Sequence, residues 1–240
     1  MQRIKMLEYA RLVVDTLPTV KAYLSPRSRY TLEALKGGEG SGNFGHSGRP
    51  GEIGGSAPVG TVRIAEIGDK NIENKINSIC KEMGFPENKI FMATSFTSVL
   101  GSYNTVTDQI TLSPFAMGEN LKSVLSHEIT HAIFQKIDDT VWEDELKKWT
   151  YDFLDVARED MDYDEVARYE DNFKILVKEF GGVSEYSNKF WNDPDVTKSK
   201  ILFKIAVNET FAEIARLDVL DRGEDVPPNW REVYKRTFKK

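Results

Sequence analysis

The chain has 240 residues, a formal net charge of −6, one cysteine and three histidines. Its length can bury a full core, and 40% hydrophobic with 29% charged residues is typical of a globular protein rather than a disordered one. The acidic net charge argues against nucleic acid as a partner. No apolar run approaches the ~20 residues that a membrane span needs. The single cysteine, Cys80, excludes an intramolecular disulfide and any multi-cysteine metal site.

Residues 1–36 form a basic segment with seven Lys or Arg and three Asp or Glu. The residues that share one helical stripe are Ile4, Leu7, Val14 and Leu17. A second short helix can follow over residues 27–36, but the segment is too short to have its own core. We therefore expect a helical N-terminal arm that docks or binds a partner. A membrane-surface helix is the weaker alternative, because the basic residues are few.

Residues 37–60 hold ten of the 17 glycines, which predicts a flexible, solvated linker. The segment lacks the G-x-x-x-x-G-K-[ST] pattern of a phosphate-binding loop and does not join a strand to a helix. His46 lies here and is expected to be exposed rather than to bind a metal, because a flexible loop must first be ordered to supply a ligand.

Residues 61–240 form the main domain, with a local charge of −9. Its first half predicts, in chain order, a strand over 61–68, a helix over 71–85 that stops near Gly84, a strand over 89–95 and a hairpin over 102–114 that turns around 104–108. From about Gly118 the pattern is almost wholly helical. The expected fold class is α+β, with a small mixed or antiparallel sheet followed by a mainly helical C-terminal part.

The helix expected over residues 121–134 carries the sequence His127-Glu128-Ile129-Thr130-His131. Residues i and i+4 of a helix share a face, so both imidazoles can reach one zinc ion. Glu128 then lies beside the metal, where it can take a proton from zinc-bound water. Composition alone predicts on the order of 0.003 chance occurrences of this pattern. Two structural histidines without a metal remain the alternative.

This motif resembles the active-site helix of the zincin metallopeptidases, and the resemblance covers roughly residues 61–220. It implies a zincin-like metallopeptidase domain over 61–240 and a zinc-dependent endopeptidase that acts on a protein or peptide substrate. Zn²⁺ would be the cofactor and Glu128 the general base. It also implies that the strand before the motif, residues 109–114, is a sheet edge that pairs with an extended substrate.

The third metal ligand must be a carboxylate, because no histidine follows His131. The metzincin subclass is excluded, since Phe134 and Ile137 stand where it places glycine and histidine. Many of the later acids fall on faces expected to be solvated: Asp138, Asp139, Glu143, Asp144, Glu145, Glu159, Asp160 and Asp162.

Glu209 and Glu213 differ from these acids, because they are i and i+4 on an otherwise apolar helical segment, residues 201–215. Acids against an apolar stripe cost free energy unless they are paired or bind metal. The segment resembles the second helix of gluzincins, N-E-x-x-x-[DE]. That resemblance implies that Glu209 is the third ligand and that Glu213 accepts a hydrogen bond from a ligand histidine. A surface pair of acids remains the alternative.

Such sites usually contain a further hydrogen-bond donor to the oxyanion. With no histidine left, a tyrosine is the expected type, and Tyr186 and Tyr234 are the candidates. For either one taken singly, a packed tyrosine with its hydroxyl at the surface is the more ordinary interpretation.

The glycine-rich tract over residues 40–51, with Gly54-Gly55-Ser56 after it, resembles a tract of tailed-phage and prophage proteins near head-morphogenesis or portal regions. It implies a phage-associated peptidase whose N-terminal arm binds a virion protein. The expected location is the bacterial cytoplasm or the virion, because Glu8, Arg11 and Asp15 interrupt any secretory signal. The alternative function is a virion structural or adaptor protein with a non-proteolytic zincin-like domain.

Overall fold

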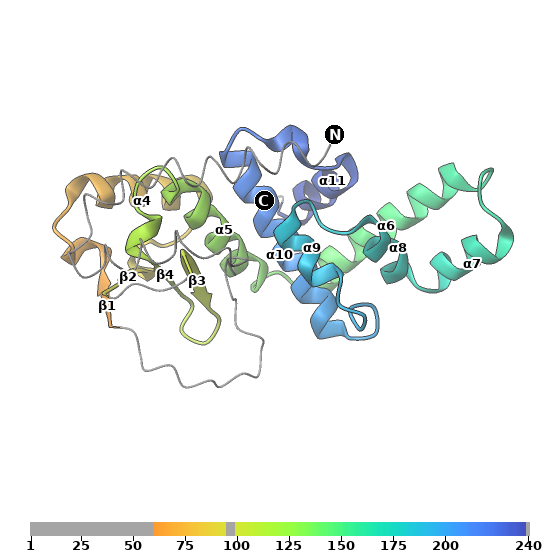
Figure 1. Cartoon of the computed structure of the whole chain (residues 1–240), viewed down its shortest axis with the longest axis horizontal. Coiled ribbons are helices and arrows are strands. Elements are labelled where there is room, and N and C mark those ends of the chain that lie inside the picture. The colour runs from red at the N-terminus through yellow and green to blue at the C-terminus, as the bar shows by residue number, and fades with distance from the viewer. Residues whose placement is uncertain (1–59, 95–98, 239–240) are drawn as a thin grey trace, which may run out of the picture. The chain divides into compact units, whose positions relative to one another are not determined.

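A computed structural model describes residues 60–94 and 99–238 (Figure 1). The expectations for the arm over 1–36, for His46 and for nearly all of the linker over 37–60 fall outside these residues. The described part is α+β, with a small mixed sheet and a mostly helical remainder, as the sequence predicts. It divides into two compact units, one of residues 60–94, 99–104 and 109–124 and one of residues 105–108 and 125–238.

The first unit contains a four-stranded sheet in the order β1-β2-β4-β3. The strands are β1 (Thr61–Arg63), β2 (Ile90–Ala93), β3 (Gly101–Asn104) and β4 (Gln109–Leu112). The central pair, β2 and β4, runs parallel with Phe91 opposite Thr111, while β1 and β3 each pair antiparallel with their neighbour. The predicted hairpin over 102–114 is confirmed as β3 and β4, joined by a tight turn in which Asp108 has a positive φ of 53°.

Helix α4 (Lys70–Met83) supplies the helical part of this unit, close to the range predicted. Asp69 begins it, because its side chain accepts hydrogen bonds from the backbone N–H groups of Asn71 and Ile72. Gly84 ends it in the left-handed conformation, with φ 68°, which a glycine adopts without steric cost. The buried residues of α4 are Ile76, Ile79 and Cys80.

Two expectations for the sheet are wrong. The strand predicted over 61–68 ends at Arg63, because residues Ile64–Glu66 form a 3-10 turn in which the Glu66 carboxylate accepts from the Arg63 backbone N–H. The strand before the His-Glu-x-x-His helix is not a sheet edge either. β4 lies between β2 and β3. Because β3 pairs with β4 through the hairpin, it occupies the edge of β4 that was expected to pair with an extended substrate.

The second unit is built from helices, and the boundary between the units falls within the first of them. They are α5 (Leu121–Phe134), α6 (Asp139–Ala157), α7 (Tyr163–Asp171), α8 (Phe173–Phe180), α9 (Glu185–Trp191), α10 (Lys200–Val219) and α11 (Pro228–Thr237). Of the remaining 3-10 turns, Glu87–Lys89 and Pro114–Ala116 belong to the first unit and Gly223–Asp225 belongs to the second. None of the described helices is long and apolar enough to cross a bilayer.

Aromatic side chains dominate the core of the second unit. Phe203 of α10 is fully buried, and its ring centroid lies 5.4 Å from Trp191, 5.8 Å from Phe173 and 6.3 Å from Trp142. These rings come from α6, α8 and α9, so one side chain of α10 joins three other helices. The helix that carries the candidate glutamates is thereby fixed by packing on several sides.

Replacing Phe203 with alanine is expected to lower the free energy of unfolding by about 3–5 kcal/mol, because a large ring is removed from a site that cannot fully collapse. Urea unfolding followed by tryptophan fluorescence measures the change. Tyr151→Ala, at a 56% exposed aromatic residue, is the matched control and should stay within about 0.5 kcal/mol of the wild type. Equal effects of the two substitutions would contradict the packing described here.

Candidate metal centre

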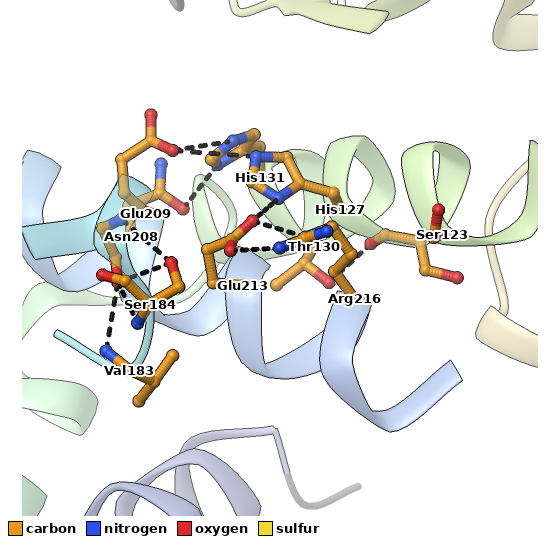
Figure 2. A network of polar contacts seen from close by, with 12 residues as sticks. Ser123, His127, Thr130, His131, Val183, Ser184, Asn208, Glu209, Glu213 and Arg216 are labelled. Carbon is orange, nitrogen blue, oxygen red and sulfur yellow. Dashed lines mark hydrogen bonds and ion pairs between the residues drawn. The ribbon is translucent and has the colours of Figure 1, made fainter. Parts of the chain in front are cut away.

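Side chains of α5 and α10 meet at a buried cluster of two histidines and two glutamates (Figure 2). His127 and His131 project from α5 one turn apart, and their ring centroids are 4.7 Å apart. Glu209 and Glu213 project from α10 at the same spacing and are 1% and 2% exposed. The helical spacing of each pair therefore brings all four side chains to one place.

Three of these residues form the one group of possible metal ligands found among the described residues. One ligand atom each of His127, His131 and Glu209 lies within 4.8 Å of the other two. Glu209 Oε2 is 3.7 Å from His127 Nε2 and 3.6 Å from His131 Nε2, which is too long for direct hydrogen bonds. Tetrahedral zinc with bonds of ~2.0–2.1 Å separates its ligand atoms by about 3.4 Å, so the donor set fits such an ion.

The other nitrogen of each histidine contacts a residue of α10. His131 Nδ1 lies 3.0 Å from Asn208 Oδ1. Because an amide oxygen only accepts, this contact is a hydrogen bond in the imidazole tautomer that carries its proton on Nδ1, and Nε2 is the atom that faces Glu209. Asn208 has no role among the expectations from sequence, although it directly precedes Glu209 on the same helix and opens the N-E-x-x-x-[DE] pattern.

His127 Nδ1 lies 3.2 Å from Glu213 Oε1. This is an ion-pair contact rather than an aligned hydrogen bond, since Nδ1 has no partner of hydrogen-bond geometry among the described residues. Arg216 holds the same carboxylate from the other side, with Nε and an outer guanidinium nitrogen each 2.8 Å from one of its oxygens. This two-pronged contact fixes the orientation of Glu213. The i, i+3 spacing of Glu213 and Arg216 could have indicated it from the sequence.

The charged side chains of the cluster shift one another's pKa values. Burial by itself lowers the pKa of His127, but contacts with Glu209 and Glu213, together with the charge of Glu128, raise that pKa to about 10. Burial by itself raises the pKa of Glu213, but His127 and Arg216 hold that pKa far below its ordinary value. The contacts therefore gather carboxylate charge around His127, and a bound cation would balance that charge.

Glu128 and Tyr186 lie at the same site. Glu128 is 8% exposed, and its charge contributes to the raised pKa values of both His127 and Tyr186. The Tyr186 ring packs edge-on to His127, with centroids 6.0 Å apart. Burial, followed by the charges of Glu209 and Glu128, raises the pKa of Tyr186 well above its ordinary value. Its hydroxyl thus stays protonated and able to donate a hydrogen bond.

Tyr234, the other candidate tyrosine, lies in the aromatic core. Its ring centroid is 5.7 Å from Phe211 and 4.7 Å from Phe238. Burial and the charge of Asp218 raise its pKa to about 12. Of the two candidates, the structure brings only Tyr186 against the histidines.

Local sequence explains why α9 presents Tyr186 at this place. Gly182 precedes the helix where an added Cβ would lie 2.4 Å from Ser187 Oγ, so the close approach requires glycine. Ser184 begins the helix by accepting a hydrogen bond from the Ser187 backbone N–H. At the other end, Trp191 Nε1 donates to Thr210 Oγ1 at 2.9 Å, next to Glu209 on α10. The tryptophan ties the tyrosine helix to the glutamate helix.

The eight acids expected on solvated faces do not join the cluster, and none of them is buried. The exposed ones are Asp138, Asp144, Glu159, Asp160 and Asp162. The half-buried ones pair with basic residues, Asp139 with Lys200 and Lys204, Glu143 with Lys200, and Glu145 with Arg236. Only the pair on the apolar helix meets the histidines.

Replacing Glu213 with glutamine is expected to weaken zinc binding by about 10- to 100-fold without removing a ligand, because the residue orients His127. Zinc titration against a chelating indicator measures the affinity. Asp218→Asn removes an acid from the same helix that pairs instead with Arg231, and it is expected to bind zinc as the wild type does. Unchanged affinity in Glu213→Gln would show that the contact with His127 has no positioning role.

A comparison of the chain with protein-family models, curated proteins and solved structures finds no match. The geometry of His127, His131 and Glu209 is therefore the principal evidence on function.

Proposed function

We propose that the protein is a zinc-dependent endopeptidase of the gluzincin type. The observation that carries this proposal is the convergence of His127, His131 and Glu209, in which the Glu209 oxygen lies 3.6 and 3.7 Å from the two histidine nitrogens, close to the separation in tetrahedral zinc. Three protein ligands leave a fourth position for water or substrate, as in catalytic rather than structural zinc sites. The α+β architecture, with a helix bearing the motif after the sheet, is compatible with a zincin-like domain.

In this proposal the residues of the chain have separate tasks. Bound zinc supplies Lewis acidity, which lowers the pKa of a water molecule toward ~7 and polarises the substrate carbonyl. Glu128 accepts the proton of the attacking water and returns it to the leaving amine. Tyr186 donates a hydrogen bond to the carbonyl oxygen as negative charge develops on it. Asn208 and Glu213 orient the two histidines.

The biological setting is proposed from the glycine-rich tract over residues 40–51 alone. Its resemblance to tracts of phage and prophage proteins supports a peptidase that acts on virion or host proteins. The location would then be the bacterial cytoplasm or the virion. The chemistry of the metal centre does not depend on this setting.

The test is metal analysis of the purified full chain beside a general protease assay. We expect about one zinc per chain, cleavage of a fluorescein-labelled casein, loss of cleavage with a zinc chelator and recovery when zinc is added back. A folded chain that neither contains zinc nor takes it up would falsify the proposal. Bound iron would also contradict it, because two histidines and one carboxylate also form the iron site of oxygenases. Zinc without cleavage would favour the virion structural or adaptor protein.

A further inference from the structure

Helices α6, α7 and α8 form a helical extension, residues 139–180, on the second unit (Figure 1). The extension has its own small cluster of buried side chains, Leu154, Tyr169 and Leu176. The four side chains of the metal centre, His127, His131, Glu209 and Glu213, come from α5 and α10 and not from this extension. Its surface therefore calls for a separate explanation.

An open groove of about 270 Å³ lies between the three helices. Its apolar walls are Phe153, Met161, Leu176 and Phe180, and its carboxylates are Glu165 and Glu179. Large apolar side chains stand exposed elsewhere on the same extension, among them Val156 at 83% and Tyr163 at 86%. Of the groove's own walls, Phe180 is 39% exposed, and a groove with exposed apolar walls is typical of an interaction site.

The surroundings of the groove are strongly acidic. Residues 152–180 contain ten acidic and four basic residues, a net charge of −6. Two of the bases are directed to other partners, Lys174 to the Phe203 ring and Lys178 to the Asp193 carbonyl. Arg168 pairs with Glu179, whereas the Glu165 carboxylate forms no ion pair among the described residues. The walls and the charge of the groove therefore favour an occupant that is both apolar and basic.

Charge also selects among possible occupants. A second copy of the extension brings −6 against −6, so like charges oppose dimerisation through this face. The rest of the main domain is acidic as well. Residues 1–36, in contrast, carry a net charge of +4, and their sequence places Ile4, Leu7, Val14 and Leu17 at helical spacing. A tethered segment also has an effective concentration in the ~mM range, and the 24 residues of 37–60 reach about 80 Å when extended.

We infer that the groove between α6, α7 and α8 is the docking site of the chain's own basic segment, residues 1–36. Its apolar stripe covers the groove, and its lysines and arginines face Glu165 and the surrounding acids. This inference is independent of the metal chemistry. It assigns the helical extension a task other than catalysis, and any partner of residues 1–36 must compete with the groove for them.

The test is carbodiimide cross-linking of the full-length chain, which joins a lysine amine to a nearby carboxylate as an amide. Mass spectrometry should find Lys5 or Lys21 joined to Glu165 or to acids beside it on α7, and the yield should fall at about 0.5 M salt. Mixing isotope-labelled with unlabelled chains separates links within one chain from links between chains. Links mainly between chains, or links spread evenly over the acids of the main domain, would overturn the inference.

Charge reversal gives a second readout. Glu165→Lys should lower the cross-links to the neighbouring acids of α7 by about threefold and speed the hydrogen exchange of residues 1–36. Glu224→Lys makes the same change of charge at an exposed site of the second unit and should leave both readouts unchanged. Met161→Ser, which removes an apolar wall without changing charge, should also speed that exchange. Unprotected residues 1–36 in the wild type, or equal behaviour of the two lysine variants, would refute docking.

Discussion

Replacing Glu128 with glutamine is expected to abolish measurable peptidase activity while zinc content and fold remain those of the wild type. Glutamine matches glutamate in size but cannot accept the proton of the attacking water, and loss of a general base costs about 10²–10⁴-fold in rate. Glu128 lies outside the ligand group of His127, His131 and Glu209, so its replacement leaves those ligands in place.

Initial cleavage rates, together with zinc content per chain, measure this effect. Glu119→Gln is the matched control, because Glu119 is exposed just before α5 and should have no effect on either quantity. A Glu128→Gln protein that cleaves at the wild-type rate would remove Glu128 from the mechanism. A protein that loses both zinc and activity would show instead that Glu128 supports metal binding.

Replacing Glu209 with alanine is expected to remove zinc, and with it all activity. The carboxylate is the only acidic ligand of the proposed centre, and its oxygen faces both histidine nitrogens at 3.6–3.7 Å. Outer residues that merely orient ligands are worth about 10- to 100-fold in affinity, so loss of a ligand should exceed that range. The remaining two histidines are too few for a stable catalytic zinc site.

Zinc retained after dialysis against a weak chelator measures this second effect. Glu224→Ala, at an exposed glutamate of the same unit, controls for the loss of one negative charge. Circular dichroism confirms that the variant is folded. If folded Glu209→Ala retains one zinc per chain, another residue is the third ligand.

Much of the fold could be predicted because its signals are local. The Asp69 cap, the left-handed Gly84 and the apolar spacing of α4 lie within one segment, and the helix has the predicted limits to within two residues. The sequence does not predict the 3-10 turn at Ile64–Glu66, where the Glu66 carboxylate accepts from the Arg63 backbone N–H. The position of β4 inside the sheet was missed as well, because strand order depends on pairing between distant segments.

By itself the sequence determined the features that depend on helical spacing. His127 and His131, one turn apart, had to share a face, as had Glu209 and Glu213. The scarcity of histidine left only a carboxylate for a third ligand. These conclusions needed no knowledge of how the helices pack against one another.

Only the tertiary structure decided what these faces meet. It brings α10 against α5, although Glu209 follows His131 by 78 residues in the sequence. It also brings Asn208 into contact with His131, and Tyr186 rather than Tyr234 against the histidines. It also created the groove between α6, α7 and α8. The physical reason is that periodicity sets directions within one helix, whereas the packing of bulky side chains such as Phe203 sets which helices become neighbours.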